Sequence, residues 1–161
     1  MTGRSLSGMP MTAADLEKVR AKLQFIREAR RQIEQIRGRG RDSLLADPIL
    51  QAAALRNLQV GIEAMLDIAH AVIAREGLGL PGTYREAIEI LLRHRILPDA
   101  HAAAFLSMAS FRNRLVHLYD TVEPAEIAKI LDQNLGDFTV FISAITERYL
   151  VSANDPGGQR P

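Results

Sequence analysis

Apolar residues between positions 12 and 150 recur at the intervals of an α-helix, and this periodicity is the feature that most restricts the fold. In the first segment, Leu16, Val19, Leu23, Ile26 and Ile33 are separated by three, four or seven residues. Such spacings place apolar side chains on one face of a helix, whereas a half-buried strand needs an apolar residue at every second position. No segment shows that alternation, so the sequence predicts an all-α chain.

Start and stop signals divide the chain into five predicted helices. Thr12 with Asp15, and Thr83 with Glu86, match the capping-box pattern of helix starts. Pro48, Pro98 and Pro124 stand at the starts of three other predicted helices, where a first helical turn tolerates proline. The predicted helices span residues 12–38, 49–75, 84–95, 99–119 and 125–150, the last with a tolerated glycine at position 136. Because the connections are short, we expect an up-down bundle of four main helices plus one short helix.

The length of the chain favours one domain. A chain of 161 residues, 47% of them hydrophobic, can bury one core of good size but is short for two. We expect a helical domain over residues 12–150. Residues 1–11 and 151–161 are rich in Gly, Pro and Ser and lack periodicity, so we expect them to be flexible tails.

Composition excludes several kinds of chemistry. The chain has no cysteine, which rules out disulfides, thiolate zinc sites and cysteine nucleophiles. Its net charge of +1 argues against a protein that holds nucleic acid through a global positive field, so any anion site must be local. No run of 18 uncharged apolar residues and no signal-peptide pattern occurs, and we expect a cytoplasmic protein without a membrane partner.

The segment FRNRLVHLYD, residues 111–120, concentrates polar side chains at the end of a predicted helix. These residues could be the solvated end of a helix, where basic groups suit the macrodipole, or they could bind a phosphate. At about 100° per residue, Arg112 and Tyr119 fall within roughly 20° of each other on an ideal helix. His117 lies about 140° from Arg112, so the two converge only if the helix bends or if they meet across a symmetry axis.

The spacing Arg112, four residues, His117, one residue, Tyr119 resembles the R-x-x-x-x-H-x-Y motif of the HEPN superfamily, in its branch of HepT-like toxins. Asn113 matches the polar residue usual after the arginine. The segments LRNLQVGIEAMLDIAHAVI and GLPGTYREAIEIL are similar to the second helix of that family and to its following loop and helix. The resemblance covers roughly residues 12–150 and implies a HEPN-like bundle.

The resemblance also implies a function. It implies a metal-independent RNA endonuclease, the toxin of a type VII-like toxin-antitoxin system, that acts on tRNA or mRNA as a homodimer and needs no cofactor. Arg112 and His117 would be catalytic, with Asn113 in support. Tyr119 would be the residue to which a minimal nucleotidyltransferase antitoxin transfers AMP. The alternative is a non-catalytic helical module that binds nucleotide or protein.

Other polar residues allow more than one interpretation. Glu63, Asp67 and His70 share a face of the second predicted helix, which can be a solvated face with ion pairs or, less readily, part of a metal site. By resemblance, Glu63 or Asp67 supports Arg112 or His117, and we expect no metal. The basic segment 27–41 can be a solvated face or a rim for the RNA backbone. We assign His94 and His101 no role, and no helix-turn-helix pattern for DNA stands out.

Overall fold

A computed structural model describes residues 9–151, apart from the side chain of Tyr119. This part of the chain contains seven α-helices and no strand, which confirms the all-α prediction. The helices are α1 (Ala13–Arg37), α2 (Arg41–Ala46), α3 (Pro48–Glu76), α4 (Tyr84–Arg93), α5 (Ala102–His117), α6 (Pro124–Gln133) and α7 (Leu135–Ile145). Most of the two predicted tails lies outside the described residues.

A capping box defines the start of α1, and an ion pair joins this start to the end of α3. Thr12 and Asp15 form the predicted capping box of α1, with backbone-to-side-chain bonds of 2.9 and 3.1 Å. Hydrogen bonds from Thr12 and then Arg75 lower the pKa of Asp15 to about 2. Arg75, near the end of α3, lies 2.7 Å from the Asp15 carboxylate. This contact joins the end of α3 to the start of α1, as expected for antiparallel neighbours.

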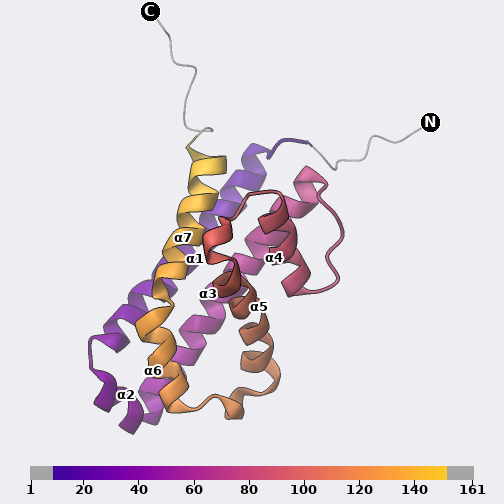
Figure 1. Cartoon of the computed structure of the whole chain (residues 1–161). Coiled ribbons are helices and arrows are strands. Elements are labelled where there is room, and N and C mark those ends of the chain that lie inside the picture. The colour runs from indigo at the N-terminus through magenta and orange to yellow at the C-terminus, as the bar shows by residue number, and fades with distance from the viewer. Residues whose placement is uncertain (1–8, 152–161) are drawn as a thin grey trace, which may run out of the picture.

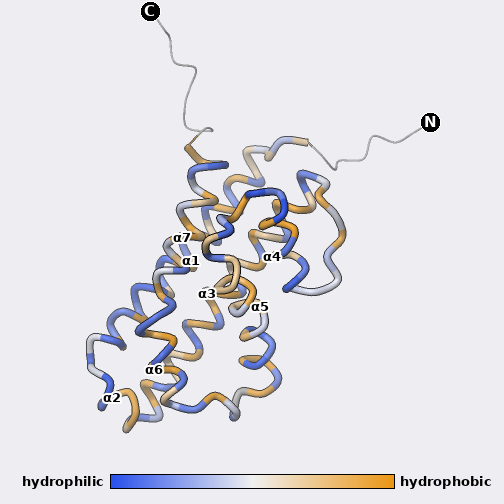
Figure 2. Tube along the Cα trace, viewed as in Figure 1, coloured by the Kyte–Doolittle hydropathy of each residue, from blue (hydrophilic) through white to orange (hydrophobic). Residues whose placement is uncertain are grey.

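The long helices α1 and α3 pack side by side and form the centre of the bundle (Figure 1). Helices α6 and α7 also pack on α1, while α4 and α5 pack on α3. Orange and blue alternate along these helices in Figure 2, as expected where one face is buried and the other is solvated. Gly61 of α3 allows a close approach, because a Cβ atom there would lie 3.0 Å from the ring of Phe138.

The last predicted helix is wrong in one respect, because it is divided. Helix α6 ends at Gln133 and α7 begins at Leu135, with Asn134 between them. Asn134 Nδ2 donates to Asp137 Oδ2 at 3.1 Å, and Asp137 N donates to Asn134 O at 3.1 Å. Asn134 thus bonds locally in place of continuing the helical pattern. The tolerated Gly136 lies just after the break.

Other boundaries also differ from the predictions, including the end of α4 at Arg93 in place of residue 95. The expected loop after the first helix contains α2, whose Leu44 is buried against the core. The predicted helix over residues 99–119 begins with a 3₁₀ turn at Asp99–His101 and becomes α-helical only at Ala102. It ends at His117, two residues early. No helix in the described part of the chain is long and apolar enough to cross a membrane.

Candidate functional site

Arg112 lies on α5 and its side chain packs inward. Its side chain is 19% exposed, and its guanidinium carbon lies 4.6 Å from the centre of the Tyr84 ring, a cation–π contact with α4. The Nε atom is buried and has no hydrogen-bond partner among residues 9–151. A buried donor without a partner is costly unless water or a ligand satisfies it. Arg112 is therefore a positioned cation whose hydrogen-bonding capacity is available.

Glu63 of α3 is the acidic neighbour of Arg112. Its Oε1 atom lies 3.7 Å from Arg112 Nε, which makes an ion pair but is too long for a hydrogen bond. The same oxygen accepts a hydrogen bond from Gln59 Nε2 at 3.2 Å. The structure therefore brings one of the two expected acidic residues next to the arginine of the motif.

Asp67, one turn further along α3, contacts a different cation. Its carboxylate accepts a hydrogen bond from Lys22 Nζ of α1 at 2.8 Å. Asp67 still shares a cavity of about 190 Å³ with Arg112. This first cavity is lined by Glu63, Leu66, Asp67, Tyr84 and Arg112. Its walls carry one cation and two carboxylates, of which only Glu63 is paired with Arg112.

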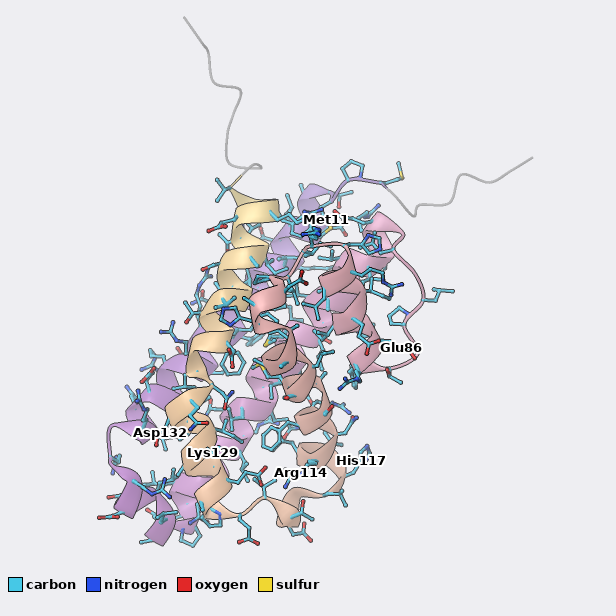
Figure 3. The ribbon with its side chains drawn as sticks, viewed as in Figure 1. Met11, Glu86, Arg114, His117, Lys129 and Asp132 are labelled. Atoms are coloured by element: carbon cyan, nitrogen blue, oxygen red, sulfur yellow. The ribbon has the colours of Figure 1, made fainter. Side chains whose placement is uncertain are left out.

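His117 is the last residue of α5, and its side chain is exposed. Figure 3 shows it pointing outward from the end of α5. The residues on either side of it are apolar and also exposed, Val116 by 40% and Leu118 by 54%. Within one chain, therefore, Arg112 packs against α4 while His117 faces solvent. Their separation of about 140° on an ideal helix is consistent with this difference.

The prediction that Tyr119 belongs to the same helix as Arg112 is wrong, because α5 ends at His117. Leu118 leaves the helical conformation with φ −132° and ψ 40°, and Tyr119 starts a 3₁₀ turn that ends at Thr121. Thr121 stabilises this turn by donating its hydroxyl to Leu118 O at 2.6 Å. The backbone of Tyr119 thus lies two residues after His117, beyond Leu118, whereas its side chain lies outside what the structure describes.

Arg114 fastens the end of α5 to α6, a role that the sequence did not reveal. Its guanidinium donates to both oxygens of Glu126, at 2.5 and 3.0 Å, and to Thr121 O at 3.1 Å. The pairing with Glu126 raises the pKa of Arg114 above its usual value. The partner is twelve residues away across a turn, so neither helical spacing nor the motif points to it.

A second cavity, of about 420 Å³, lies beside the first. It contains Asn113, the residue that follows Arg112, and is lined by His70, Pro81, Gly82, Thr83, Tyr84 and Asn113. Tyr84 lines both cavities. Sequence reasoning missed this aromatic residue, although its place at the first position of a capped helix, in a segment similar to the HEPN family, was a usable signal.

The three polar residues considered as a metal site in α3 have separate partners. Glu63 is near Arg112, Asp67 pairs with Lys22, and His70 Nδ1 lies 2.9 Å from the Leu66 carbonyl oxygen. Across residues 9–151 no group of three or more His, Asp or Glu side chains is placed to hold a metal ion. Glu63 therefore faces α5, Asp67 faces α1, and His70 contacts the backbone of its own helix.

Two of the six arginines in the basic segment 27–41, Arg31 and Arg37, form ion pairs on the surface of α1. Arg31 lies 2.6 Å from Glu28, and this arginine lowers the pKa of the Glu28 carboxyl to about 2. Arg37 contacts both Glu34, at 3.8 Å, and Asp132, at 3.4 Å. These ion pairs agree with a solvated face and leave less free charge for an RNA backbone than the sequence alone suggests.

Comparison with known proteins gives one family match. A family model described as ribonuclease HepT-like matches residues 26–145. The match extends over most of the chain. It includes both cavities and the motif at the end of α5.

Two curated relatives and one solved structure illustrate the similarity. An mRNA nuclease HepT from Shewanella oneidensis is 27% identical over 124 residues, 77% of this chain and 92% of the relative. A tRNA nuclease HepT from Aphanizomenon flos-aquae is 26% identical over 114 residues, 71% of this chain and 77% of the relative. The structure of a tri-AMPylated HEPN toxin from S. oneidensis in complex with MNT antitoxin superposes with a TM-score of 0.75 at 26% identity, over 81% of this chain and 97% of that one. The predicted HEPN-like fold is confirmed.

Proposed function

This chain belongs to the ribonuclease HepT-like family, and we propose that it is a metal-independent RNA endonuclease, the toxin of a toxin-antitoxin pair. One observation carries the proposal. Arg112 is held on the ring of Tyr84, beside a cavity, and its guanidinium donates no hydrogen bond to any of the described residues. A guanidinium in this state is ready to bind an anion such as a phosphodiester.

The reaction needs only groups that RNA and this chain supply. The 2′-hydroxyl oxygen of RNA forms a bond to phosphorus while the bond from phosphorus to the 5′-oxygen breaks. The 2′-hydroxyl proton passes to the neutral imidazole of His117, and the imidazolium so formed gives a proton to the leaving 5′-oxygen. Histidine suits both roles because its side chain titrates near neutral pH. The products are a 2′,3′-cyclic phosphate and a 5′-hydroxyl, and Arg112 stabilises the charge on the phosphate oxygens.

The complete site, in this proposal, forms between two copies of the chain. Arg112 packs inward and His117 faces solvent, so one chain supplies the two groups on different faces. Val116 and Leu118 place exposed apolar surface beside His117, which a second copy would cover. A two-fold axis near His117 would bring the motifs of both chains together and pair His117 of one chain with Arg112 of the other.

The proposal gives Tyr119 the regulatory role. In the S. oneidensis relative the toxin is tri-AMPylated and bound to an MNT antitoxin. Tyr119 is the tyrosine of the motif and begins the turn two residues after His117. AMP added there would bring bulk and negative charge close to the site that receives the RNA phosphate. The substrate class in this proposal is mRNA or tRNA, as in the names of the two relatives, and the proposed compartment is the cytoplasm.

RNA cleavage in the presence of EDTA tests the function. Purified wild type should cut total RNA, tRNA or mRNA with EDTA present and leave 2′,3′-cyclic phosphate ends. His117→Ala should lower the cleavage rate by about 10² to 10⁴, the usual range for loss of an acid-base group. His94→Ala is the matched control, because His94 is exposed at the end of α4, and it should cleave like wild type.

Two results would overturn the proposal. Cleavage by wild type that appears only when a divalent metal is added would contradict metal independence. Equal rates for wild type and His117→Ala would remove the histidine from the reaction. If wild type binds nucleotide or RNA and cuts none of the substrates, the non-catalytic binding module becomes the better interpretation.

A further inference from the structure

The second cavity is not used by the proposed reaction. It has a volume of about 420 Å³ and lies against the start of α4, where α3 and α5 contribute one polar side chain each. Its volume falls in the range of small-molecule sites, which start at about 300 Å³. The polar groups that line it are an imidazole, an amide, a threonine hydroxyl and a phenol, from His70, Asn113, Thr83 and Tyr84.

The hydrogen-bonding state of His70 follows from its contact with the backbone. Its Nδ1 atom lies 2.9 Å from Leu66 O, and a carbonyl oxygen can only accept, so Nδ1 carries a proton. In the neutral ring, Nε2 is then the free acceptor. No side chain described in residues 9–151 bonds to it. His70 therefore offers the cavity a fixed acceptor on a half-buried aromatic ring.

Asn113 adds an amide with both donor and acceptor capacity. Its side chain is exposed, lines the same cavity and has no hydrogen-bond partner in the described part of the chain. Asn113 follows Arg112 directly on α5. A ligand that contacts this amide therefore lies within one residue of the cation that the proposed function assigns to the phosphate.

Tyr84 links the two cavities. Its ring contacts the Arg112 guanidinium at 4.6 Å and the His70 ring at 5.8 Å, the latter with an angle of 80° between the ring planes. Because the same ring lines both cavities, a phosphate bound at Arg112 would have the second cavity as its neighbour. Aromatic rings and amides are the groups with which proteins hold unstacked bases of single-stranded RNA.

We propose that the cavity of His70, Tyr84 and Asn113 is a nucleobase pocket for the nucleotide next to the phosphate held by Arg112. The inference rests on the proposed function, because it takes the ligand to be single-stranded RNA. The base packs against the aromatic rings, and its edge bonds to Asn113 and to the acceptor Nε2 of His70. The pocket thus favours bases that present a donor to His70, and it contributes to the choice of cleavage position.

Binding of an RNA that cannot be cleaved tests the pocket without relying on catalysis. The probe is a set of 2′-O-methyl oligonucleotides, each with one abasic position moved along the strand. In wild type, one abasic position should weaken binding roughly tenfold, as expected for the loss of one base held on aromatic rings. In His70→Ala and in Asn113→Ala, the same abasic change should weaken binding clearly less than tenfold, because each variant has already lost one of the contacts to the base.

The controls separate folding, function and pocket. His94→Ala should keep the tenfold effect, and Asn113→Ala keeps the test valid if His70→Ala fails to fold, since the Asn113 side chain is exposed. The proposal is overturned if no abasic position affects wild-type binding, or if the effect persists in Asn113→Ala. If wild type cuts RNA but no abasic position affects binding, the proposed ribonuclease function stands and the nucleobase pocket is wrong. If wild type cuts no RNA but one abasic position weakens its binding more than that of Asn113→Ala, the pocket stands and the ribonuclease function is wrong.

Discussion

Arg112 is set apart from Arg114, the other arginine of α5, by what surrounds it. Tyr84 lies under its guanidinium and Glu63 lies 3.7 Å from its Nε, so its position is determined from two helices. Arg114, two residues later, uses its donors on Glu126 and Thr121. The two arginines thus differ in role, because Arg114 joins α5 to α6 while Arg112 can bind a ligand.

Replacing Arg112 by lysine tests whether geometry matters as well as charge. Arg112→Lys keeps the positive charge but removes the planar group that lies on Tyr84 and can donate two parallel hydrogen bonds. We expect the single-turnover rate of RNA cleavage to fall roughly 10²-fold, the scale of losing one oriented donor, with little change in melting temperature. A wild-type rate for Arg112→Lys would show that charge alone suffices.

Tyr119→Phe tests the regulatory role of the motif tyrosine. The substitution removes the hydroxyl that would accept AMP, while a phenol, with a pKa of about 10, is a poor proton acceptor at neutral pH. We expect Tyr119→Phe to keep most of the cleavage activity and to gain no mass when incubated with a cognate nucleotidyltransferase, ATP and magnesium. Intact-mass spectrometry before and after incubation checks this. AMP units on the Phe variant, or none on wild type, would leave Tyr119 without this role.

At the scale of helices, the end of α5 is held by contacts that are distant in sequence. Arg114 donates to Glu126 of α6 and to the carbonyl of Thr121, and thereby closes the turn that carries Tyr119. His117 lies in the last turn before this closure. The position of the exposed histidine therefore depends on an ion pair between two helices and not only on the α-helix itself.

A double-mutant cycle with Arg114→Ala and Glu126→Ala measures this fastening. Both side chains are about one third exposed, so we expect a coupling free energy of only about 0.5 to 1 kcal/mol in urea unfolding. We expect a larger effect on cleavage, because the segment with His117 would lose its fixed position. The pair Arg31 and Glu28 on α1 is the control, with a coupling of at most about 0.5 kcal/mol and unchanged cleavage. Wild-type cleavage in both single variants would show that the pair only contributes stability.

Helix starts were predictable from the sequence because their signals are local. Thr12 and Thr83 cap α1 and α4 as expected, since each bonds to a backbone amide three residues away. The break at Asn134 and the end of α5 at His117 were not predictable. They depend on local hydrogen bonds of Asn134 and Thr121 that compete with the helical ones. The apolar spacing continues across both breaks, so the sequence pattern does not show them.

The candidate site was predictable only in part for the same reason. The resemblance to the HEPN motif led to Arg112 and His117, and it left the supporting acid open between Glu63 and Asp67. Tyr84 and His70 gained their significance only when α3, α4 and α5 came together, because no pattern within one helix relates them to Arg112. The assignment of roles to these residues remains a prediction.

At the scale of the whole molecule, one chain presents the two groups of the proposed reaction on different faces. Arg112 packs toward α3 and α4, while His117 points outward between two exposed apolar residues, Val116 and Leu118. This arrangement suits a protein whose site is completed by a second copy. The central claim is therefore that RNA is cut by Arg112 of one chain and His117 of another.

Complementation between two inactive variants tests that claim most directly. Purified Arg112→Ala and His117→Ala are each assayed alone, then mixed in equal amounts, allowed to exchange subunits and assayed again for RNA cleavage. The mixture should regain about a quarter of wild-type activity, because roughly half of the dimers are mixed and each holds one intact site of two. Activity should rise with protein concentration as dimers form. A mixture that stays at the average of its two components at every concentration would contradict the claim.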